Sequence, residues 1–174
     1  ALSIGTNFFM EIARLRAARL LWAKIVQAFG GGEEAQKMSL HTRTSAWNQT
    51  IYDPHVNLLR ATTEAFSSAV GGCDSLHVSP FDELVRAPDE FSRRIARNTH
   101  TVLREESQIT RTVDPAGGSW YVESLTDAVG RKTWAIFQEV EKQGGMAKAL
   151  TAGWPQVQIA DTAPNQGLFS TTLA

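Results

Sequence analysis

The stretch Ser75-Leu76-His77-Val78-Ser79-Pro80-Phe81-Asp82-Glu83 decides the fold. A short apolar core, Leu76 and Val78, runs straight into a cluster of polar side chains. This pattern is typical of a buried strand of a barrel or parallel sheet at the point where it opens onto a site. Residues 39–45 have the same form, and helix signals follow both stretches. The sequence therefore predicts repeated strand–helix units with polar residues at the strand ends.

Each predicted helix has a recognisable start. Asn7 and Asp53, which precedes Pro54, are expected N-caps, and Ser124 with an acidic residue three positions later can cap a fourth helix. Pro88-Asp89-Glu90 is expected to begin a third helix, with its acidic residues in the first turn, where the helix dipole favours them. Residues 109–113 predict a weak strand, and residues 146–152 a short extra helix. The residues expected to face the core recur at helical spacing: Phe8, Ile12, Leu15, Arg19, Trp22 and Val26; Val56, Leu59, Phe66 and Val70; Phe91, Ile95 and Val102; Leu125, Val129, Ile136 and Val140.

Composition excludes several classes of protein. The chain has 174 residues, 43% of them apolar, and a formal net charge of -1, so no overall field attracts nucleic acid or an anionic membrane. No apolar run reaches the roughly 18 residues of a membrane span. Cys73 is the one cysteine, which excludes an internal disulfide and suits a reducing cytosol. We expect a cytoplasmic protein without a signal peptide, whose residues 1–5 are the end of a strand.

The number of strand–helix units limits the architecture. We count about three to four units, whereas a complete (β/α)8 barrel needs about 250 residues. The chain is therefore either a small open sheet or part of a barrel. From residue 161 onward the sequence is small and polar with little pattern, which predicts a poorly ordered tail.

Polar residues at the predicted strand ends are candidate ligands. His41 and His77 occupy equivalent places on two strands, and each is either a residue that binds a ligand in a common cavity or a structural histidine. Asp82 is expected to cap a helix rather than to bind ligand hydroxyls. For Glu83 the spacing leaves both roles open.

Three arginines, Arg14, Arg16 and Arg19, lie close together on the first predicted helix. They could meet a phosphate or a partner chain. A solvated helix face is the favoured interpretation, because charge runs on helices usually face water.

Several stretches in one order resemble a known family. They are residues 7–23, 43–45, 81–83, 92–99, 114–119 and 139–146, and they resemble the acyl-CoA-binding barrel domain of the adenosylcobalamin-dependent methylmalonyl-CoA mutases. The resemblance implies the last part of a (β/α)8 TIM barrel over residues 1–159, from the end of its fifth strand to its eighth helix. Residues 160–174 would be the tail. The other barrel half would precede residue 1, and the cobalamin domain would follow or lie on another chain.

The resemblance also implies an activity. Family members isomerise methylmalonyl-CoA and succinyl-CoA by a radical rearrangement that adenosylcobalamin starts. The residues that contact the acyl-CoA substrate belong to the missing half, so no catalytic residue is assigned in this chain.

The resemblance places a cofactor-facing rim on two strands. The family has histidine, glutamine and glycine on one, and asparagine, glutamate and alanine on the next. The corresponding residues are His41, Arg43, Ala46, Ser79, Glu83 and Leu84. Residues 43–48 and 52–54 around this altered rim resemble the small-subunit type more closely, which pairs with a large subunit or a second mutase chain and lacks a functional cofactor site. The alternatives are a catalytic mutase for another branched acyl-CoA, and a non-catalytic structural or dimerising barrel subunit.

Overall fold

The computed structural model describes residues 1–170, with side chains to residue 162. The chain divides into two compact units, Ala1–Gly130 and Arg131–Ala174. No helix within the described residues is long and apolar enough to cross a membrane.

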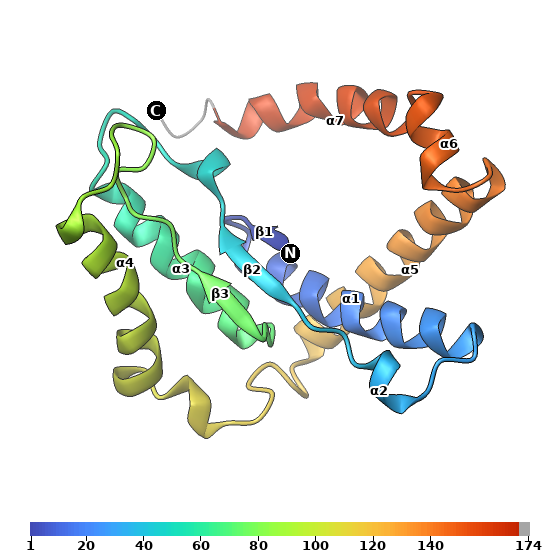
Figure 1. Ribbon diagram of the computed structural model, residues 1–174, viewed down its shortest axis with the longest axis horizontal. Coiled ribbons are helices and arrows are strands. Elements are labelled where there is room, and N and C mark those ends of the chain that lie inside the picture. Colours follow the sequence, from blue (N-terminus) through green and yellow to red (C-terminus); the bar gives the residue numbers. More distant parts are fainter. Residues whose placement is uncertain (171–174) are drawn as a thin grey trace. The chain divides into compact units, whose positions relative to one another are not determined.

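A small parallel sheet lies in the first unit. Its strands are β1 (Leu2–Ile4), β2 (His41–Thr44) and β3 (Ser75–His77), in the order β1-β2-β3. Ser3 lies opposite Arg43, which in turn lies opposite His77. Figure 1 shows the three strands side by side, with β2 in the middle. The predicted strand–helix alternation is confirmed, and three strands form an open sheet rather than a closed barrel.

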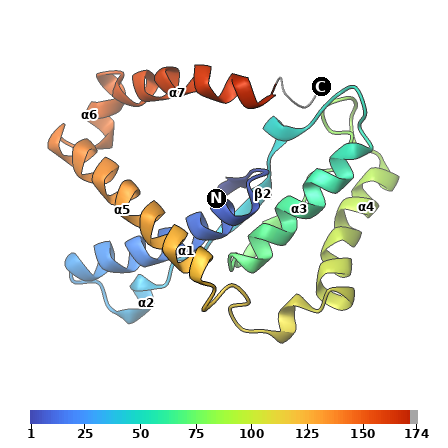
Figure 2. The ribbon, with the colours of Figure 1, turned by 180° about the vertical axis from the view of Figure 1, so that it is seen from behind.

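Helices connect the strands. The elements of the first unit are α1 (Phe8–Ala28), α2 (Glu33–Gln36), α3 (Val56–Val70), α4 (Glu90–Thr101), the beginning of α5 (Trp120–Lys142), the 3₁₀ turns η1 (Ala46–Asn48) and η3 (Ile109–Arg111), and the π-helical turn η2 (Val102–Glu106). The second unit contains the rest of α5, α6 (Met146–Thr151) and α7 (Trp154–Ser170). In Figure 2, α1 and α3 cover the same face of the sheet.

Two expected helix starts are confirmed: the N-cap Asn7 of α1, and the helix expected to begin at Pro88–Glu90, which is α4. The Asn7 side chain accepts from the N–H of Met10, and Asp89 accepts from the N–H of Ser92 (2.8 Å). The prediction for Asp53 is wrong by two residues, because His55 is the N-cap and the Asp53 carbonyl accepts from Val56 instead.

The prediction that Ser124 caps a helix is wrong. The helix α5 begins four residues earlier, at Trp120, where the Ser119 carbonyl accepts the N–H of Glu123 at 2.8 Å. The tight turn over residues 114–119 therefore starts the helix, and Ser124 lies inside it.

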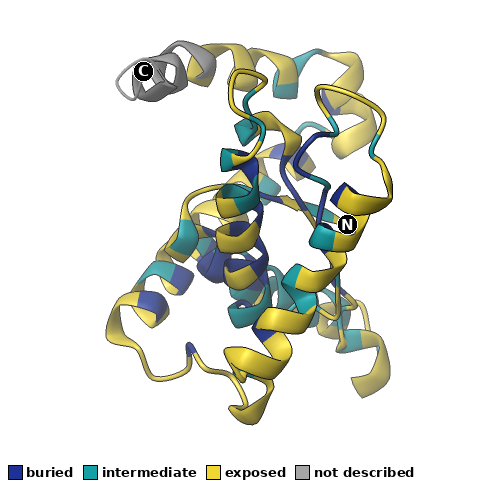
Figure 3. Ribbon diagram, turned by 90° about the vertical axis from the view of Figure 1, so that its left-hand side faces the viewer, coloured by how far each residue is buried: buried dark blue, intermediate teal, exposed yellow. Residues whose placement is uncertain are grey.

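The core lies between the helices and the sheet. Its three buried clusters are Ile4, Leu15 and Leu40; Ala61, Ala65, Val78, Ala96 and Leu103; and Ile12, Ala116 and Val122. Figure 3 shows the buried residues gathered where helices and strands meet. On β2, Thr42 and Thr44 are buried, and Thr42 Oγ1 hydrogen-bonds Ser68 Oγ of α3 at 2.6 Å. Strand alternation leaves His41 and Arg43 on the open face.

The predicted apolar face of α3 is wrong in part. Leu59 is 69% exposed and Phe66 is 39% exposed. The residues that α3 buries are small or polar: Asn57, Ala61, Glu64, Ala65, Ser67 and Ser68. Small side chains let the helix approach the sheet closely, and the polar ones hold the neighbouring loops.

Several other positions also differ from their predicted burial. Trp22, Phe91, Val102 and Ile136 are exposed, whereas Ile12, Leu15 and Val140 are buried as predicted. On α4 the buried residues are Ser92 and Ala96, so a small-residue face again replaces the expected apolar stripe.

The weak strand predicted over residues 109–113 is wrong. The segment forms the 3₁₀ turn η3 and lacks a strand partner within the described residues. Gln108 and Asp114, with φ of 52° and 47°, bend the backbone on either side of it, which is incompatible with an extended ladder.

The boundary expected at residue 159 and the poorly ordered tail over residues 160–174 stay predictions. The helix α7 continues through the expected boundary at residue 159 to Ser170, and residues 171–174 lie outside the described part. The extent of a barrel domain over residues 1–159 stays a prediction.

The three arginines of α1 bind within the chain instead of forming a solvated face. Arg14 pairs with Glu11, and Arg16 pairs with Asp114 and Glu123. Arg19 donates to the carbonyls of Met38 (2.7 Å) and Gly72 (2.5 Å) and to the Asp74 carboxylate (2.9 Å). The last arginine therefore joins the ends of the two connections that enter β2 and β3.

The end of α3 approaches α1 closely at Gly71, which yields a prediction. A Cβ there would lie 2.7 Å from Leu15 Cδ1 and 3.2 Å from Ile12 Cα. We expect Gly71→Ala to lower the free energy of unfolding by about 1–3 kcal/mol, because the helices must move apart. Gly130→Ala in α5 is the matched control, since its Cβ would meet Ala17 at an ordinary 4.0 Å. Urea denaturation followed by circular dichroism measures both, and equal stabilities would contradict this packing.

Candidate functional site

The open face of the sheet is polar. Ser3, His41, Arg43, Ser75 and His77 share this face and are all exposed. His41 Nδ1 lies 2.8 Å from Ser75 Oγ. The two histidines look to the same side, but they are not equivalent in register, because His77 lies opposite Arg43 rather than His41.

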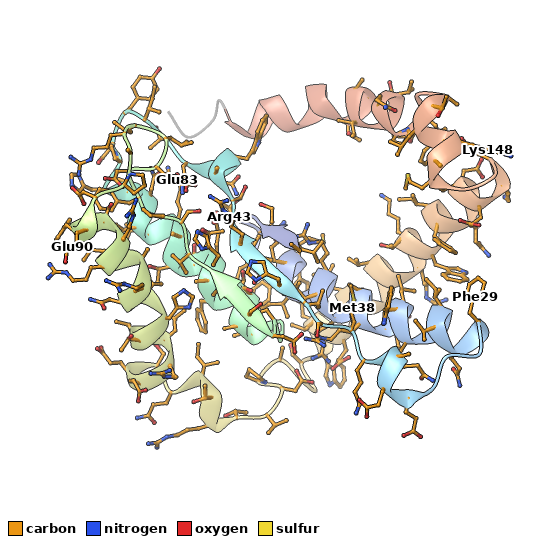
Figure 4. All side chains as sticks on the ribbon, in the orientation of Figure 1. Phe29, Met38, Arg43, Glu83, Glu90 and Lys148 are labelled. Atoms are coloured by element: carbon orange, nitrogen blue, oxygen red, sulfur yellow. The ribbon has the colours of Figure 1, made fainter. Side chains whose placement is uncertain are left out.

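An arginine links the carboxyl ends of two neighbouring strands. Arg43 Nε donates to Ser79 Oγ (3.2 Å), and its Nη2 donates to Glu83 Oε2 (3.0 Å). Ser79 is buried and is itself fixed by a hydrogen bond from its N–H to Thr44 Oγ1 (2.9 Å). Figure 4 shows Arg43 and Glu83 close together beyond the end of β2. Glu83 is thus the partner of Arg43, and its role toward a ligand stays a prediction.

The ion pair between Arg43 and Glu83 lies at the edge of solvent. The Arg43 side chain is 54% exposed, whereas that of Glu83 is 15% exposed. Exposed ion pairs contribute little to the free energy of folding, about 0–1 kcal/mol. The main effect of this pair is therefore on which polar groups the edge of the sheet exposes.

The other expected site residues lie near the same edge. Ala46 begins the loop after β2, and Leu84, 44% exposed, lies in the loop after β3. No hydrogen bond among the described residues links His41 to the cluster formed by Arg43, Ser79 and Glu83. The structure thus brings three of the six together, on the edge that we call the rim: the carboxyl ends of β2 and β3 with loops 45–50 and 79–85.

Asp82 does not cap a helix, in contrast to the prediction. It is buried and accepts from Arg86 Nε at 2.8 Å, while Asp89 is the N-cap of α4. Its backbone carbonyl also accepts from the N–H of Val85 (2.9 Å). Asp82 therefore stabilises the loop after β3.

A buried asparagine ties the two rim loops to each other, and sequence reasoning missed it. Asn57 of α3 is fully buried. It accepts from the N–H of Thr50 (2.9 Å) and donates to the carbonyls of Thr50 (2.9 Å) and Phe81 (3.0 Å). The sequence did contain a signal for this role, because Asn57 is a polar residue directly after Val56, the first residue of the expected apolar face.

Two buried glutamates hold the loops after β1 and β2. Glu11 of α1 accepts from the N–H of Gly5 at 3.0 Å. Glu64 of α3, 2% exposed, accepts from the N–H of Ser45 (2.9 Å) and from Asn48 Nδ2 (3.2 Å). Burial raises the pKa of Glu64 to about 7, and the nearby Glu11 carboxylate adds to the rise, while the bonds from Ser45 and Asn48 oppose it.

A hollow of about 640 Å³ lies at the opposite end of β3. Residues 69–76 line it together with Arg16, Arg19, His100 and residues from η2 to Pro115. Burial lowers the pKa of His100. This hollow contains none of the expected rim residues.

Parallel strands with helices on one face and a polar edge at their carboxyl ends define a segment of an α/β fold of the barrel kind or the open-sheet kind. Comparison with known proteins decides the family. The family model described as methylmalonyl-CoA mutase matches residues 1–167. The chain is 48% identical over 162 residues to the methylmalonyl-CoA mutase of Cereibacter sphaeroides, covering 92% of this chain and 23% of that protein.

Both subunits of a two-subunit relative also match. In Porphyromonas gingivalis the methylmalonyl-CoA mutase large subunit is 46% identical over 162 residues (92% of this chain, 23% of the subunit). The small subunit is 46% identical over 164 residues (93% and 26%). The chain belongs to the methylmalonyl-CoA mutase family, an isomerase family that uses adenosylcobalamin, and it spans about a quarter of the length of these relatives.

Replacing Asn57 tests how the rim is held. Asn57→Ala leaves the N–H of Thr50 and the carbonyls of Thr50 and Phe81 without this partner. We expect a loss of about 2–3 kcal/mol in the free energy of unfolding, because buried unpaired groups are costly. Asn98→Ala, at an exposed position of α4, is the control and should stay within about 0.5 kcal/mol. Chemical denaturation gives both values, and a small loss at Asn57 would show that the loops hold without it.

Proposed function

We propose that this chain forms the last part of the (β/α)8 barrel of a methylmalonyl-CoA mutase. Two observations support the barrel over a doubly wound sheet. First, α1 and α3 cover the same face of the sheet, as all helices of a barrel do, and the order β1-β2-β3 contains no reversal of the kind that moves helices to the second face of a doubly wound sheet. Second, the uncovered face is lined with polar side chains, as expected of a barrel interior that receives a ligand. The substrate is an acyl-CoA, and the reaction of the whole protein is the isomerisation of methylmalonyl-CoA and succinyl-CoA.

The rim residues do not fit adenosylcobalamin well. The acceptor atoms Ser79 Oγ and Glu83 Oε2 are already occupied by Arg43. A half-exposed guanidinium would lose hydration against a neutral corrin amide, and desolvating a charge is costly. Leu84 adds apolar bulk at the same edge. We derive no catalytic step through the cofactor in this chain.

This misfit favours the small-subunit type, with a mutase large subunit as the partner that holds the cofactor. The single observation that carries this assignment is the bridge from Arg43 to Ser79 and Glu83. The rim then occupies the position of a cofactor site, but its side chains are not suited to bind the cofactor. Its residues are His41, Arg43, Ala46, Ser79, Glu83 and Leu84.

A second candidate is a catalytic mutase that acts on another branched acyl-CoA. This candidate is supported by the equal identity of the chain to the large and the small subunit, because overall similarity does not distinguish the catalytic type from the small-subunit type. This candidate requires corrinoid binding without a partner. A purely structural barrel subunit, the third candidate, requires neither corrinoid nor acyl-CoA binding in any assembly.

A chimeric mutase distinguishes these candidates. This chain replaces the matching segment of a large subunit, and adenosylcobalamin binding is measured by absorbance titration. We expect an affinity at least about tenfold weaker than that of the host, because Arg43 must be desolvated. The double change Arg43→Gln with Leu84→Ala should recover most of the loss, while Arg97→Gln, on the exposed side of α4, should not.

Two outcomes would contradict the small-subunit proposal. Corrinoid affinity equal to that of the host would favour the catalytic candidate. If the chimera also fails to turn over methylmalonyl-CoA when paired with a small subunit, even after the rim is restored, the mutase function itself is rejected.

A further inference from the structure

The loop after β2 depends on one buried carboxylate. Ser45 directly follows the strand that carries Arg43, and the next residues form the turn η1. Glu64 contacts both ends of this short segment, through the N–H of Ser45 and the side chain of Asn48. The N–H of Ser45 is shared with the Ile4 carbonyl of β1 at 3.0 Å. The carboxylate therefore fixes where the rim loop leaves the sheet.

The surroundings of Glu64 compensate its charge poorly. Glu11 of α1 faces Glu64 and carries the same charge. Glu11 is itself paired with Arg14. From the helix of Glu64, Arg60 provides a weak opposing charge, and that arginine also donates to Asn57 at 3.1 Å. From the loop Glu64 receives only the neutral donors of Ser45 and Asn48. A proton on Glu64 removes the repulsion at this site.

We propose that Glu64 is a positioning residue and a proton-sensitive latch for the rim loop, residues 45–49. The protonated side chain keeps the loop closed, and the ionised side chain favours its release into water. The latch also positions Ala46 and the 90% exposed Trp47 beside Arg43 at the rim, and this consequence rests on the proposed function. The latch itself does not.

The sign of the pH dependence follows from linkage. In the closed loop the pKa of Glu64 is raised from 4.5 to about 7. When the loop opens, water reaches the carboxylate and its pKa falls back toward 4.5. A group with a raised pKa in the closed state stabilises that state below the raised value, and this stabilisation is lost as pH rises through it. The loop is therefore closed more firmly at pH 6 than at pH 8.5.

Neutral glutamine provides the matched variant. Glu64→Gln keeps an oxygen to accept from Ser45, and a rotated Asn48 amide can accept from its NH₂. It should hold the loop at every pH, since it cannot ionise. Glu64→Ala removes both contacts and should release the loop at every pH. A side chain that acted only by packing would show no such dependence on protonation.

Hydrogen–deuterium exchange of the cofactor-free 174-residue chain tests the latch. After correction for intrinsic rates, amides 45–49 should be protected about tenfold more at pH 6 than at pH 8.5. The difference should vanish in Glu64→Gln, with protection kept at both pH values. Glu11→Gln should keep the direction of the response but make it smaller, because Glu11 contributes to the raised pKa of Glu64, and Glu34→Gln, on a side chain that is 87% exposed, should not change it.

The latch is overturned if the wild-type loop exchanges at the same corrected rate at both pH values, or if Glu64→Gln keeps the pH response. If Glu64→Ala does not fold, the wild type and Glu64→Gln decide the question without it. The same exchange measured in the apo chimera serves if the chain associates. Because no corrinoid enters these measurements, a failure of the mutase function, seen by titration and turnover, is distinguished from a failure of the latch.

Discussion

The structure of the first unit depends on the contact between α3 and the sheet. The helix buries a face made of small and polar side chains, so its backbone approaches the strands closely at Ala61, Ala65 and Ser68. An apolar face of large residues would hold the helix farther away. At that distance Asn57 and Glu64 could not reach the loops beyond the strands.

The polar residues of this face connect packing to the candidate site. Each strand ends in a loop, and a helix that packs on the sheet reaches back to hold it: Glu11 holds the loop after β1, Glu64 that after β2, and Asn57 that after β3 as well. Buried polar groups stabilise a single arrangement when all are satisfied. Residues that would not contact a ligand therefore fix the position of the rim. Arg43, Ser79 and Glu83 lie on this edge, whose loops are held by the helices packed on the sheet.

The bridge at the rim is the basis of the proposed small-subunit type. Arg43 joins two strands whose carboxyl ends would otherwise offer free acceptors, and it does so at the solvent edge where such a pair adds little stability. A contact of low energetic value at the proposed site affects which polar groups the edge exposes rather than how the fold is held. The small-subunit proposal follows from that distinction.

The sequence by itself determined the alternation of strands and helices, the N-cap Asn7, the start of α4 at Pro88–Glu90, the position of His41 on the face opposite Thr42, and the resemblance to the mutase family. These are local properties, read from periodicity, from the chemistry of capping residues, or from consecutive stretches of residues. Only the tertiary structure decided that Leu59 and Phe66 are exposed, that Arg19 binds carbonyls at the ends of two connections, and that Arg43 pairs with Glu83. Each of these depends on segments far apart in the chain, and helical spacing cannot tell a face that packs on a sheet from one that does not. The pKa of Glu64 has the same origin, because desolvation arises from neighbours that only folding brings together.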